Sequence, residues 1–478
     1  MKNVAIIGAG PSGLAAARWL KANGFHPDIF ESHSDIGGQW NNTNPKSGVW
    51  PQMRTNTYLS TTHFSDLDYP DGTAIFPGNQ EVLQHLNDFA QLFDLKDHLH
   101  TGMTLTRLTR RDMGYRLTFG GPDGTKVVDT SHVVIATGRY NKPIIPDVPG
   151  LDSFSGRLGA THAFRYKDPD LYRNARVIVA GGAISALEVA SDLAMLGAAS
   201  VHVAQRRQRY VMPKMVRGVP FEYYGFTYGD AARPAPTDPD TARAEMLEFA
   251  LAYGGDPARY GAPAPDPDPL KAGFTGSQHY LNLVAEDRLR PTPWIAQIEG
   301  QMVTFTDGTK TEADAILFGT GFDLDLSFLD HDIANTLEVS RKGLTLSDFT
   351  LHPDLPGLAF LGLFAQNGGY FPVIEAQARY LAYCWSGQIN CDTAHLRSGV
   401  NACRIEKHHA DYQNQHQMAL RFARLSGTDP QGQIDAALMN QVEQSATTTV
   451  MYRLAGPDSL VNARARFEKS FERYGPKQ

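Results

Sequence analysis

Hydrophobic and polar positions follow alternating patterns along the first two thirds of the chain. Short apolar runs that end in small residues, such as "HVVIATG" at 132–138, predict strands buried on both faces of a sheet. Residues 79–94 repeat apolar side chains at helical spacing and predict an amphipathic helix. Residues 115–128 and 303–322 each place Asp-Gly between alternating residues and predict hairpins, the second followed by a buried strand. Strands mixed with helices in this way indicate an α/β fold.

A buried strand, a glycine turn and a helix occur in succession at "VAIIGAGPSGLAAARWL", which starts at Val4. Gly8 permits the tight turn, Gly10 lets the backbone approach a pyrophosphate, and Gly13 lets the helix pack on the strand. Pro11 and Ser12 complete a turn whose helix N-terminus favours phosphate. Glu31 follows at the end of the next strand, where a carboxylate accepts hydrogen bonds from ribose hydroxyls. This unit therefore predicts a dinucleotide site.

A second unit of the same kind starts at Arg176 with "RVIVAGGAISALEVASDL". Its turn contains Gly181, Gly182 and Ser185, but alanine stands at positions 183 and 186, where the pattern expects its second and third glycines. The segment "VHVAQRRQR" follows where the ribose selector lies, and it is basic rather than acidic. Such side chains suit a 2′-phosphate, so NADP is predicted in preference to NAD. The selector residues are Gln205, Arg206, Arg207 and Arg209.

Two dinucleotide units in one chain predict a flavoprotein, with FAD in the first unit, that accepts a hydride from NADPH. The chain has 478 residues and predicts two or three domains. We divide it into a first FAD-binding part, an NADP-binding part, a second FAD-binding part and a helical C-terminal extension. Their bounds are 1–150, 151–315, 316–385 and 386–478. Within the NADP-binding part, the Pro-, Asp- and Ala-rich residues 230–269 predict an irregular, partly mobile insertion.

Composition narrows the class of partner. Hydrophobic residues make up 42% and charged residues 20% of the chain, and the net charge is −7. This balance argues against nucleic acid and anionic membranes as partners, and no signal peptide or membrane span is expected. Three cysteines, Cys384, Cys391 and Cys403, show neither a CxxC pair nor a metal-binding spacing, so idle thiols, no metal and a cytoplasmic location are predicted. The missing CxxC also separates the chain from disulfide reductases.

Several motifs, taken in order, resemble the flavin-containing monooxygenases, which belong with the Baeyer–Villiger enzymes among the class B flavoprotein monooxygenases. The motifs run from the N-terminus to about residue 385. They are "GAGPSGL", "GGQW", "RTNTYLSTTHFSDLDYP", "ATGRY", "HAFRYKDP", "GTGF" and "FPVIEAQARY". Their order and spacing together are specific. Two departures from the family pattern are the alanines of the second turn and two extra residues between Gly156 and His162.

The resemblance implies roles for residues outside the glycine turns. Asn56 matches the asparagine that the family uses to hold the reactive oxygen–flavin adduct, and a carboxamide offers a donor and an acceptor without charge. His162 matches the histidine of the segment that links the domains and is tied to NADP binding. Further implied cofactor contacts are Gly38, Gln39, Trp40, Thr137, Gly138, Gln366 and Pro372. Pro372 also suits the first turn of a helix that points its N-terminus at the flavin.

The activity implied by the resemblance is oxygenation of a soft nucleophile, an amine nitrogen or a sulfide sulfur, by NADPH and oxygen through a flavin C4a-hydroperoxide. Baeyer–Villiger oxygenation of a ketone is an alternative, which "QRRQRYVMPK" favours and Tyr166, at a position where those enzymes usually have Trp, disfavours. A weakly coupled NADPH oxidase or reductase is another. A flavin-binding sensor without catalysis is the fourth, with the C-terminal extension as its only candidate effector module. The partners expected are a small-molecule substrate and oxygen, and a homodimer is considered.

Overall fold

The computed structural model describes residues 2–122, 124–341, 343–409 and 412–477. Its first large sheet has five parallel strands in the order β22-β7-β1-β2-β3. The bounds are Lys2–Ile7 for β1, Phe25–Phe30 for β2, Leu99–His100 for β3, His132–Ile135 for β7 and Leu358–Phe360 for β22. Helices α1 (Pro11–Ala22), α2 (Asn79–Leu92) and α10 (Tyr370–Ser386) share one hydrophobic core with this sheet. The first sheet is therefore built from both ends of the predicted FAD-binding region.

The second large sheet is also parallel, in the order β16-β11-β10-β20-β9. Its strands are β9 (Gly159–His162), β10 (Arg176–Ala180), β11 (Ser200–Ala204), β16 (Arg290–Thr292) and β20 (Ala315–Phe318), and helices α3 (Ile184–Leu196) and α8 (Tyr280–Ala285) pack on it. The expected boundary between residues 315 and 316 falls inside β20. Since β20 pairs between β10 and β9, the second unit continues a few residues further than the sequence suggested.

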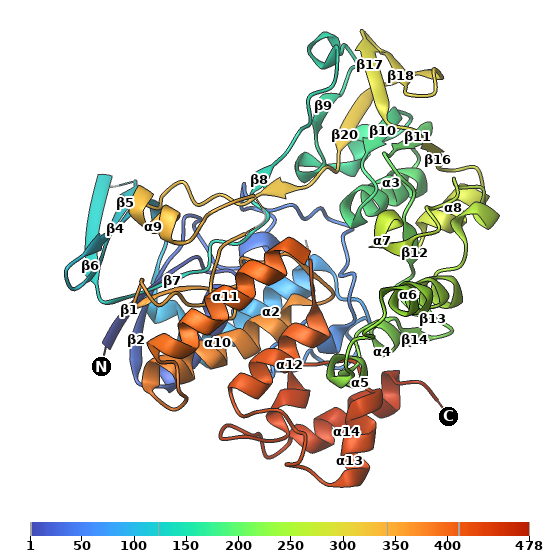
Figure 1. Cartoon of the computed structure of the whole chain (residues 1–478). Coiled ribbons are helices and arrows are strands. Elements are labelled where there is room, and N and C mark those ends of the chain that lie inside the picture. The colour runs from blue at the N-terminus through green and yellow to red at the C-terminus, as the bar shows by residue number, and fades with distance from the viewer. Residues whose placement is uncertain (1, 123, 342, 410–411, 478) are drawn as a thin grey trace.

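Two antiparallel hairpin sheets flank the parallel ones, at opposite ends of the molecule (Figure 1). One consists of β4 (Thr104–Arg111), β5 (Gly114–Gly121) and β6 (Gly124–Thr130), and the other of β17 (Ile295–Glu299), β18 (Met302–Phe305) and β19 (Lys310–Glu312). Both predicted hairpins are thus confirmed. The predicted amphipathic helix at 79–94 is confirmed as α2.

The Pro-rich insertion was predicted to be irregular, and this is wrong for its middle part. Residues Pro239–Tyr253 form helix α6, and shorter helices α5 (Tyr228–Ala232) and α7 (Pro269–Ala272) lie at either side of it. The Asp238 side chain accepts a hydrogen bond from the Thr241 N–H, and Pro239 occupies the first helical position. Aspartate followed by proline is a favourable helix start, so these residues begin the helix rather than prevent it.

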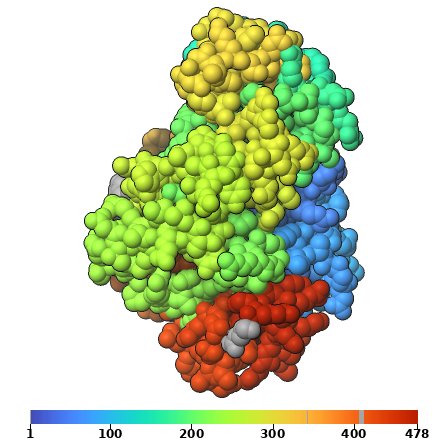
Figure 2. Space-filling view, turned by 90° about the vertical axis from the view of Figure 1, so that its right-hand side faces the viewer, coloured from blue at the N-terminus to red at the C-terminus, as the bar shows by residue number. Residues whose placement is uncertain are grey.

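The C-terminal extension is helical, as predicted. It contains α11 (Thr393–His409), α12 (Gln415–Leu425), α13 (Ala436–Gln444) and α14 (Ala463–Tyr474). Helices α12 and α13 share a core with α10 and with α5 of the insertion. Figure 2 shows this red region at one end of the molecule, against both the green insertion and the blue N-terminal residues. The extension is therefore packed on both halves of the chain.

Two of the three cysteines are not idle thiols. Cys384, at the end of α10, and Cys391, before α11, form a disulfide across the turn between the helices, with 5.5 Å between their Cα atoms. The prediction is wrong for this pair because the turn brings the two Cα atoms within bridging distance, which their spacing alone does not reveal. Cys403 is buried and remains a thiol. Within the described part of the chain, no helix combines the length and apolar character that a membrane crossing requires.

Candidate functional site

The first glycine turn joins β1 to α1 and needs glycine at two of its positions. Gly8 has φ +106°, and a Cβ there would lie 2.5 Å from the Ala136 carbonyl oxygen. A Cβ on Gly13 would lie 1.9 Å from the Gly8 carbonyl oxygen. Both contacts are far below van der Waals distance, so only glycine lets the turn lie against β7 and the helix against the strand. Gly10 is the N-cap of α1 and Pro11 its first residue, which leaves free N–H groups at the helix start.

The "GGQW" segment packs directly on this turn. A Cβ on Gly38 would lie 3.0 Å from the Gly10 Cα, and the Gly37 N–H donates to the Ala9 carbonyl. Gln39 then crosses to the next loop, since its Nε2 donates to the Tyr140 carbonyl at 2.8 Å. Trp40 is half-buried and contacts the core of the first sheet. Gly10, Gly38 and Gln39 are thus together at the predicted FAD turn.

Glu31 lies beside the same turn and is 5% exposed. Its Oε2 accepts a hydrogen bond from the Ala9 N–H at 2.7 Å, and its Oε1 accepts one from the His33 N–H at 2.8 Å. The carboxylate is therefore fixed by backbone donors within one residue of the glycines. This is the position from which a ribose diol could be held.

The loop after β7 and the start of α10 form a second part of the site. The Thr137 hydroxyl is buried and has no hydrogen-bond partner, and the space beside Gly138 is open. Tyr140 in this loop shares a hydrogen bond of 2.8 Å with the hydroxyl of Tyr370, the first residue of α10. Pro372 is buried in the first turn of α10, as predicted.

Gln366 and Ser12 complete this part of the site. The Gln366 Nε2 donates to the Gly369 carbonyl at 2.7 Å, but its Oε1 is buried without a partner. Ser12, in the first turn of α1, presents its Oγ to Gly362, where a Cβ would lie 2.4 Å away. A residue larger than glycine at 362 would therefore push against α1.

Asn56 is half-buried, and its Oδ1 is another buried oxygen without a partner. Its neighbours are fixed by residues from the other half of the chain. The Lys214 Nζ donates to the Thr55 carbonyl at 3.3 Å and pairs with Glu188 of α3 at 3.1 Å. The Tyr58 N–H donates to Oε1 of Glu222 at 2.7 Å. The segment around Asn56 therefore lies against residues of the predicted NADP-binding part.

Sequence analysis did not identify Glu222 or Lys214. Glu222 begins the short helix α4 (Glu222–Gly225) and is 2% exposed. Burial raises the pKa of Glu222 to about 7, although hydrogen bonds from its own N–H and from the Tyr58 N–H and the positive charge of Lys214 lower it. A glutamate among the aromatics of "VPFEYYGF" was the only signal in the sequence. Neither its partner nor its burial follows from that segment alone.

Three of the predicted contacts, Asn56, Thr137 and Gln366, therefore leave a buried oxygen without a partner. Buried polar atoms in a folded protein normally have partners, so such groups need a ligand or water to satisfy them. All three side chains are uncharged, and a Cβ on Gly10 would meet only the Gly38 backbone within 4 Å, so this side of the turn is otherwise open. These features fit FAD: the α1 N-terminus would hold its pyrophosphate, Glu31 its ribose, and the three uncharged side chains could supply hydrogen-bond partners for its remaining polar atoms.

The second glycine turn has the same backbone path as the first. Its N-cap, Ala183, has φ −102° and ψ 172°, close to the −78° and −176° of Gly10. A Cβ on Gly319 at the end of β20 would lie 2.7 Å from the Cβ of Ala186. The alanine at 186 is therefore accommodated because its neighbour across the strand is glycine. This compensation explains how the turn keeps its shape without the third glycine.

The predicted NADP selector residues separate into two groups. Gln205 is 7% exposed, its Nε2 donates to Gln208 at 2.6 Å, and its Oε1 faces Gly182. Arg206 and Arg207 are exposed, and the Arg206 guanidinium lies over the Trp294 ring, 4.7 Å from its centroid. Arg209 is half-buried and donates to the Phe274 carbonyl, and burial, then Arg207, lowers its pKa. Ser185 is exposed in the first turn of α3. Two cations therefore face solvent beside the second turn.

His162 ends β9 and is 4% exposed. One ring nitrogen lies 3.1 Å from the Gly321 carbonyl, and the other accepts from the Phe164 N–H at 3.1 Å. Burial lowers the pKa of His162. The ring thus has protein partners on both nitrogens and fixes the loop after β20, so its tie to NADP stays a prediction.

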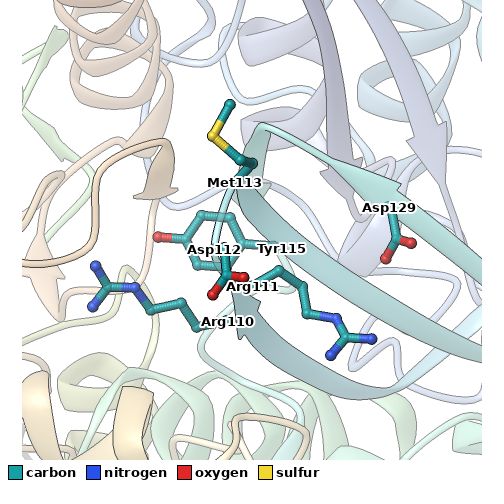
Figure 3. A pocket seen from close by; sticks show the side chains of 6 residues that line it. All are labelled: Arg110, Arg111, Asp112, Met113, Tyr115 and Asp129. Carbon is teal, nitrogen blue, oxygen red and sulfur yellow. The ribbon is translucent and has the colours of Figure 1, made fainter.

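An open depression of about 710 Å³ lies elsewhere, on the β4–β5–β6 sheet (Figure 3). None of the predicted site residues lines it, and its Asp129 forms an ion pair with Arg116 at the surface. The lining residues are Arg110, Arg111, Asp112, Met113, Tyr115 and Asp129. We assign it no part in the site.

Comparison with known proteins identifies the class to which this fold and site belong. The family model described as flavin-binding monooxygenase-like matches residues 1–236 and 258–425, and the gap between the two ranges contains α6. The chain belongs to this family, and the predicted cofactors, FAD and NADP, are those of the family. It is therefore a flavin-dependent monooxygenase, an enzyme that uses oxygen and a small-molecule substrate.

Individual relatives cover most of the chain. It is 24% identical to a 4-hydroxybenzoate brominase (decarboxylating) from Pseudoalteromonas luteoviolacea, over 98% of this chain and 93% of that protein. It is 27% identical to dimethylaniline monooxygenase [N-oxide-forming] 2 from Rattus norvegicus, over 81% of this chain and 74% of that protein. Among solved structures, S-allyl-L-cysteine S-oxygenase from Allium sativum matches with TM-score 0.67 at 21% identity, over 99% of both chains. An open structure of cyclohexanone monooxygenase matches with TM-score 0.69 at 18% identity, over 89% of this chain and 98% of that one.

Proposed function

We propose that the protein uses NADPH and molecular oxygen to oxygenate a soft nucleophile, the nitrogen of an amine or the sulfur of a sulfide. The observation that carries this proposal is the Asn56 carboxamide, whose buried oxygen has no hydrogen-bond partner among the described residues. When bound, FAD would accept a hydride from NADPH and activate oxygen. The chain itself supplies binding, orientation and exclusion of water.

Asn56 can hold an oxygen-bearing group without taking its proton, because a carboxamide donates and accepts hydrogen bonds but is not a base in water. An oxygen donor that stays protonated is an electrophile, which suits amines and sulfides. A deprotonated one is a nucleophile, which suits ketones. The uncharged oxygens of Asn56, Thr137 and Gln366 therefore favour amine or sulfide oxygenation. The rat relative, named as N-oxide-forming, supports this class of substrate, whereas the likeness to the garlic S-oxygenase concerns the fold.

Tyr166 bears on the Baeyer–Villiger alternative. Its ring is buried against Trp50, and its hydroxyl donates to Asp192 of α3 at 2.8 Å. Tryptophan, the usual residue of Baeyer–Villiger enzymes at this position, has no hydroxyl to make this bond. The likeness to cyclohexanone monooxygenase concerns the fold and gives that alternative no further support.

The proposed NADPH preference depends on Arg206 and Arg207, which are exposed beside the second turn and are free to meet a 2′-phosphate. A cytoplasmic location and a homodimer also stay predictions. The Cys384–Cys391 disulfide removes the thiol argument for a reducing compartment.

A panel of amines, sulfides and ketones tests the proposal, with products identified by mass and NADPH consumption followed in parallel. We expect N-oxides or sulfoxides in step with NADPH loss. Ester formation from ketones, with amines and sulfides inert, would establish the Baeyer–Villiger alternative. NADPH loss without any product would indicate a weakly coupled oxidase, and no NADPH loss a sensor.

A further inference from the structure

The C-terminal extension reaches the loop that carries Gln366. Strand β24 (Gln413–Asn414) pairs in parallel with β23 (Gln366–Asn367), and the Gln413 N–H donates to the Ala365 carbonyl at 2.9 Å. The extension therefore makes backbone contacts with the loop that carries Gln366, whose Oε1 has no partner among the described residues. The family motifs found in the sequence end near residue 385, and the family model continues over these contacts to residue 425.

Gln415, the first residue of α12, makes the closest side-chain contact with this loop. It is fully buried, with 0% exposure. Its Oε1 accepts a hydrogen bond from the Gly369 N–H at 2.6 Å, and its Nε2 donates to the Thr447 carbonyl at 2.8 Å. The Thr447 N–H in turn donates to the Phe226 carbonyl in the other half of the chain. Gln415 thus links Gly369 to Thr447, and the Thr447 backbone is hydrogen-bonded to Phe226.

The loop packs closely against both Gln415 and the segment that follows Asn56. Gly368 has φ +89°, and a Cβ on it would lie 2.5 Å from the Gln415 Oε1. A Cβ on Gly369 would lie 2.8 Å from the Thr61 carbonyl, on the segment that follows Asn56. The Gly369 carbonyl accepts the hydrogen bond from the Gln366 side chain. Gln415 and Gln366 therefore bind the two peptide groups that meet at the Gly369 Cα, so the position of Gly369 bears on the direction in which the Gln366 Oε1 points.

We propose that Gln415 is a positioning residue for the flavin site. It holds the Gly369 N–H, and by fixing Gly369 it positions the next carbonyl, which orients the Gln366 carboxamide, and the start of α10 beside the place that the ring would occupy. This inference rests on the proposed function, because it takes the Gln366 loop to face the flavin. It gives the C-terminal extension a role in coupling NADPH oxidation to oxygenation, in place of that of a separate effector module.

Three substitutions and one control test the role in the full-length protein. Gln415→Leu removes both hydrogen bonds at similar volume, and Gln415→Asn keeps the amide but shortens its reach. Gln415→Glu, protonated at this buried site, keeps one acceptor and one donor and should rescue the defect. Gln417→Leu makes the same chemical change two residues later in α12, where Gln417 is exposed. The readings are hydrogen–deuterium exchange of residues 365–370 without flavin, FAD affinity, the visible spectrum of bound FAD, and the fraction of NADPH that ends as peroxide.

We expect Gln415→Leu to exchange faster at 365–370, to bind FAD about tenfold more weakly and to release several times more peroxide. Gln415→Glu and Gln417→Leu should resemble the wild type. If the leucine variant does not fold, the asparagine variant should show the same changes in smaller measure. Faster exchange with an unchanged flavin spectrum and unchanged peroxide release would reduce Gln415 to a purely structural residue and overturn the inference. Failure of the proposed function looks different: the wild type would bind FAD and yield no oxygenated product.

Discussion

The predicted site residues differ in whether their buried polar atoms have hydrogen-bond partners. Asn56, Thr137 and Gln366 each keep one buried oxygen without a partner among the described residues, whereas both ring nitrogens of His162 have backbone partners. An unpaired buried oxygen costs folding free energy unless something else meets it. The three oxygens therefore mark where a ligand contributes most, and the engaged groups mark where the chain orders itself.

Substitution of Asn56 by aspartate should separate hydride transfer from oxygen transfer. The new carboxyl group adds a charge, or an acidic proton, to a partly buried position whose oxygen already lacks a partner. We expect the variant to bleach its flavin with NADPH under argon at about the wild-type rate, and in air to release peroxide with little oxygenated product. Anaerobic stopped-flow absorbance and a peroxide assay provide the two measurements. The exposed Asn440→Asp serves as the control, and wild-type coupling in Asn56→Asp would remove Asn56 from the chemistry.

Glu222 should make the folded state less stable as pH rises. Its pKa of about 7 in the folded protein exceeds the usual 4.5, so the folded state binds more protons than the unfolded chain between these values. The free energy of unfolding should therefore fall by about 3 kcal/mol as pH rises through this window, and then level off. Glu222→Gln keeps an acceptor for the Tyr58 N–H but cannot ionise.

Denaturant unfolding of the wild type and Glu222→Gln across that pH window measures the difference between them, in which the contributions of all other groups cancel. The variant should gain stability relative to the wild type as pH increases. A difference that does not change with pH would mean that Glu222 ionises in the folded protein at its ordinary pKa.

At the scale of elements, the two strand–turn–helix units were predictable from the sequence. The residue changes elsewhere that let the second turn do without its third glycine were not. The glycines at 8 and 13 identify the first turn because sterics leave no alternative at these two positions. The fit of Ala186 against Gly319 depends on a neighbour that is far away in sequence. Helix α6 was not predicted because a composition rich in Pro, Asp and Ala, as in residues 230–269, is typical of irregular segments. Glu222 and Gln415 were not predicted because the groups that they bind, Tyr58 and Gly369, are also distant in the chain.

Gly319→Ala should destabilise the second unit by about 1–3 kcal/mol, because the added methyl group would overlap the Ala186 side chain. Ala186→Gly alone should cost about 1 kcal/mol through helix propensity. The double variant should lose less than the sum of the two, since one of the colliding methyl groups is gone. Thermal unfolding of the four proteins completes the cycle. Strict additivity would show that Gly319 and Ala186 do not constrain each other.

At the scale of the whole molecule, buried ion pairs attach the extension to the flavin half. Arg453, 3% exposed, donates to Asp66 at 3.0 Å and to the Ser65 hydroxyl at 2.7 Å, and lies 3.8 Å from Glu375 of α10. Arg379 of α10 pairs with Asp458 of the extension. A segment tied to the core in this way is part of the domain rather than an attachment to it.

Arg453→Leu should destabilise the protein by about 3–5 kcal/mol, because it leaves the carboxylates of Asp66 and Glu375 buried with one cation fewer. Arg464→Leu is the control, since Arg464 pairs with Glu468 at the surface and its loss should cost less than about 1 kcal/mol. Denaturant midpoints of both variants give the comparison. Equal costs would mean that the buried cluster contributes no more than a surface pair.

The order of strands in the first sheet has a consequence for biosynthesis. Strand β7 pairs with β1 on one side and with β22 on the other, yet β22 is translated only after the whole second sheet. Until residue 358 has left the ribosome, the nascent chain holds an open hydrogen-bonding edge along a very hydrophobic strand. All strands of the second sheet, from β9 to β20, have been translated by then, so the second unit can fold first. Its folding brings the chain before β9 close to the chain after β20, and β22 can then pair with β7. Ribosome-stalled chains that end shortly before β22 should therefore recruit chaperones more strongly than chains that end after α10.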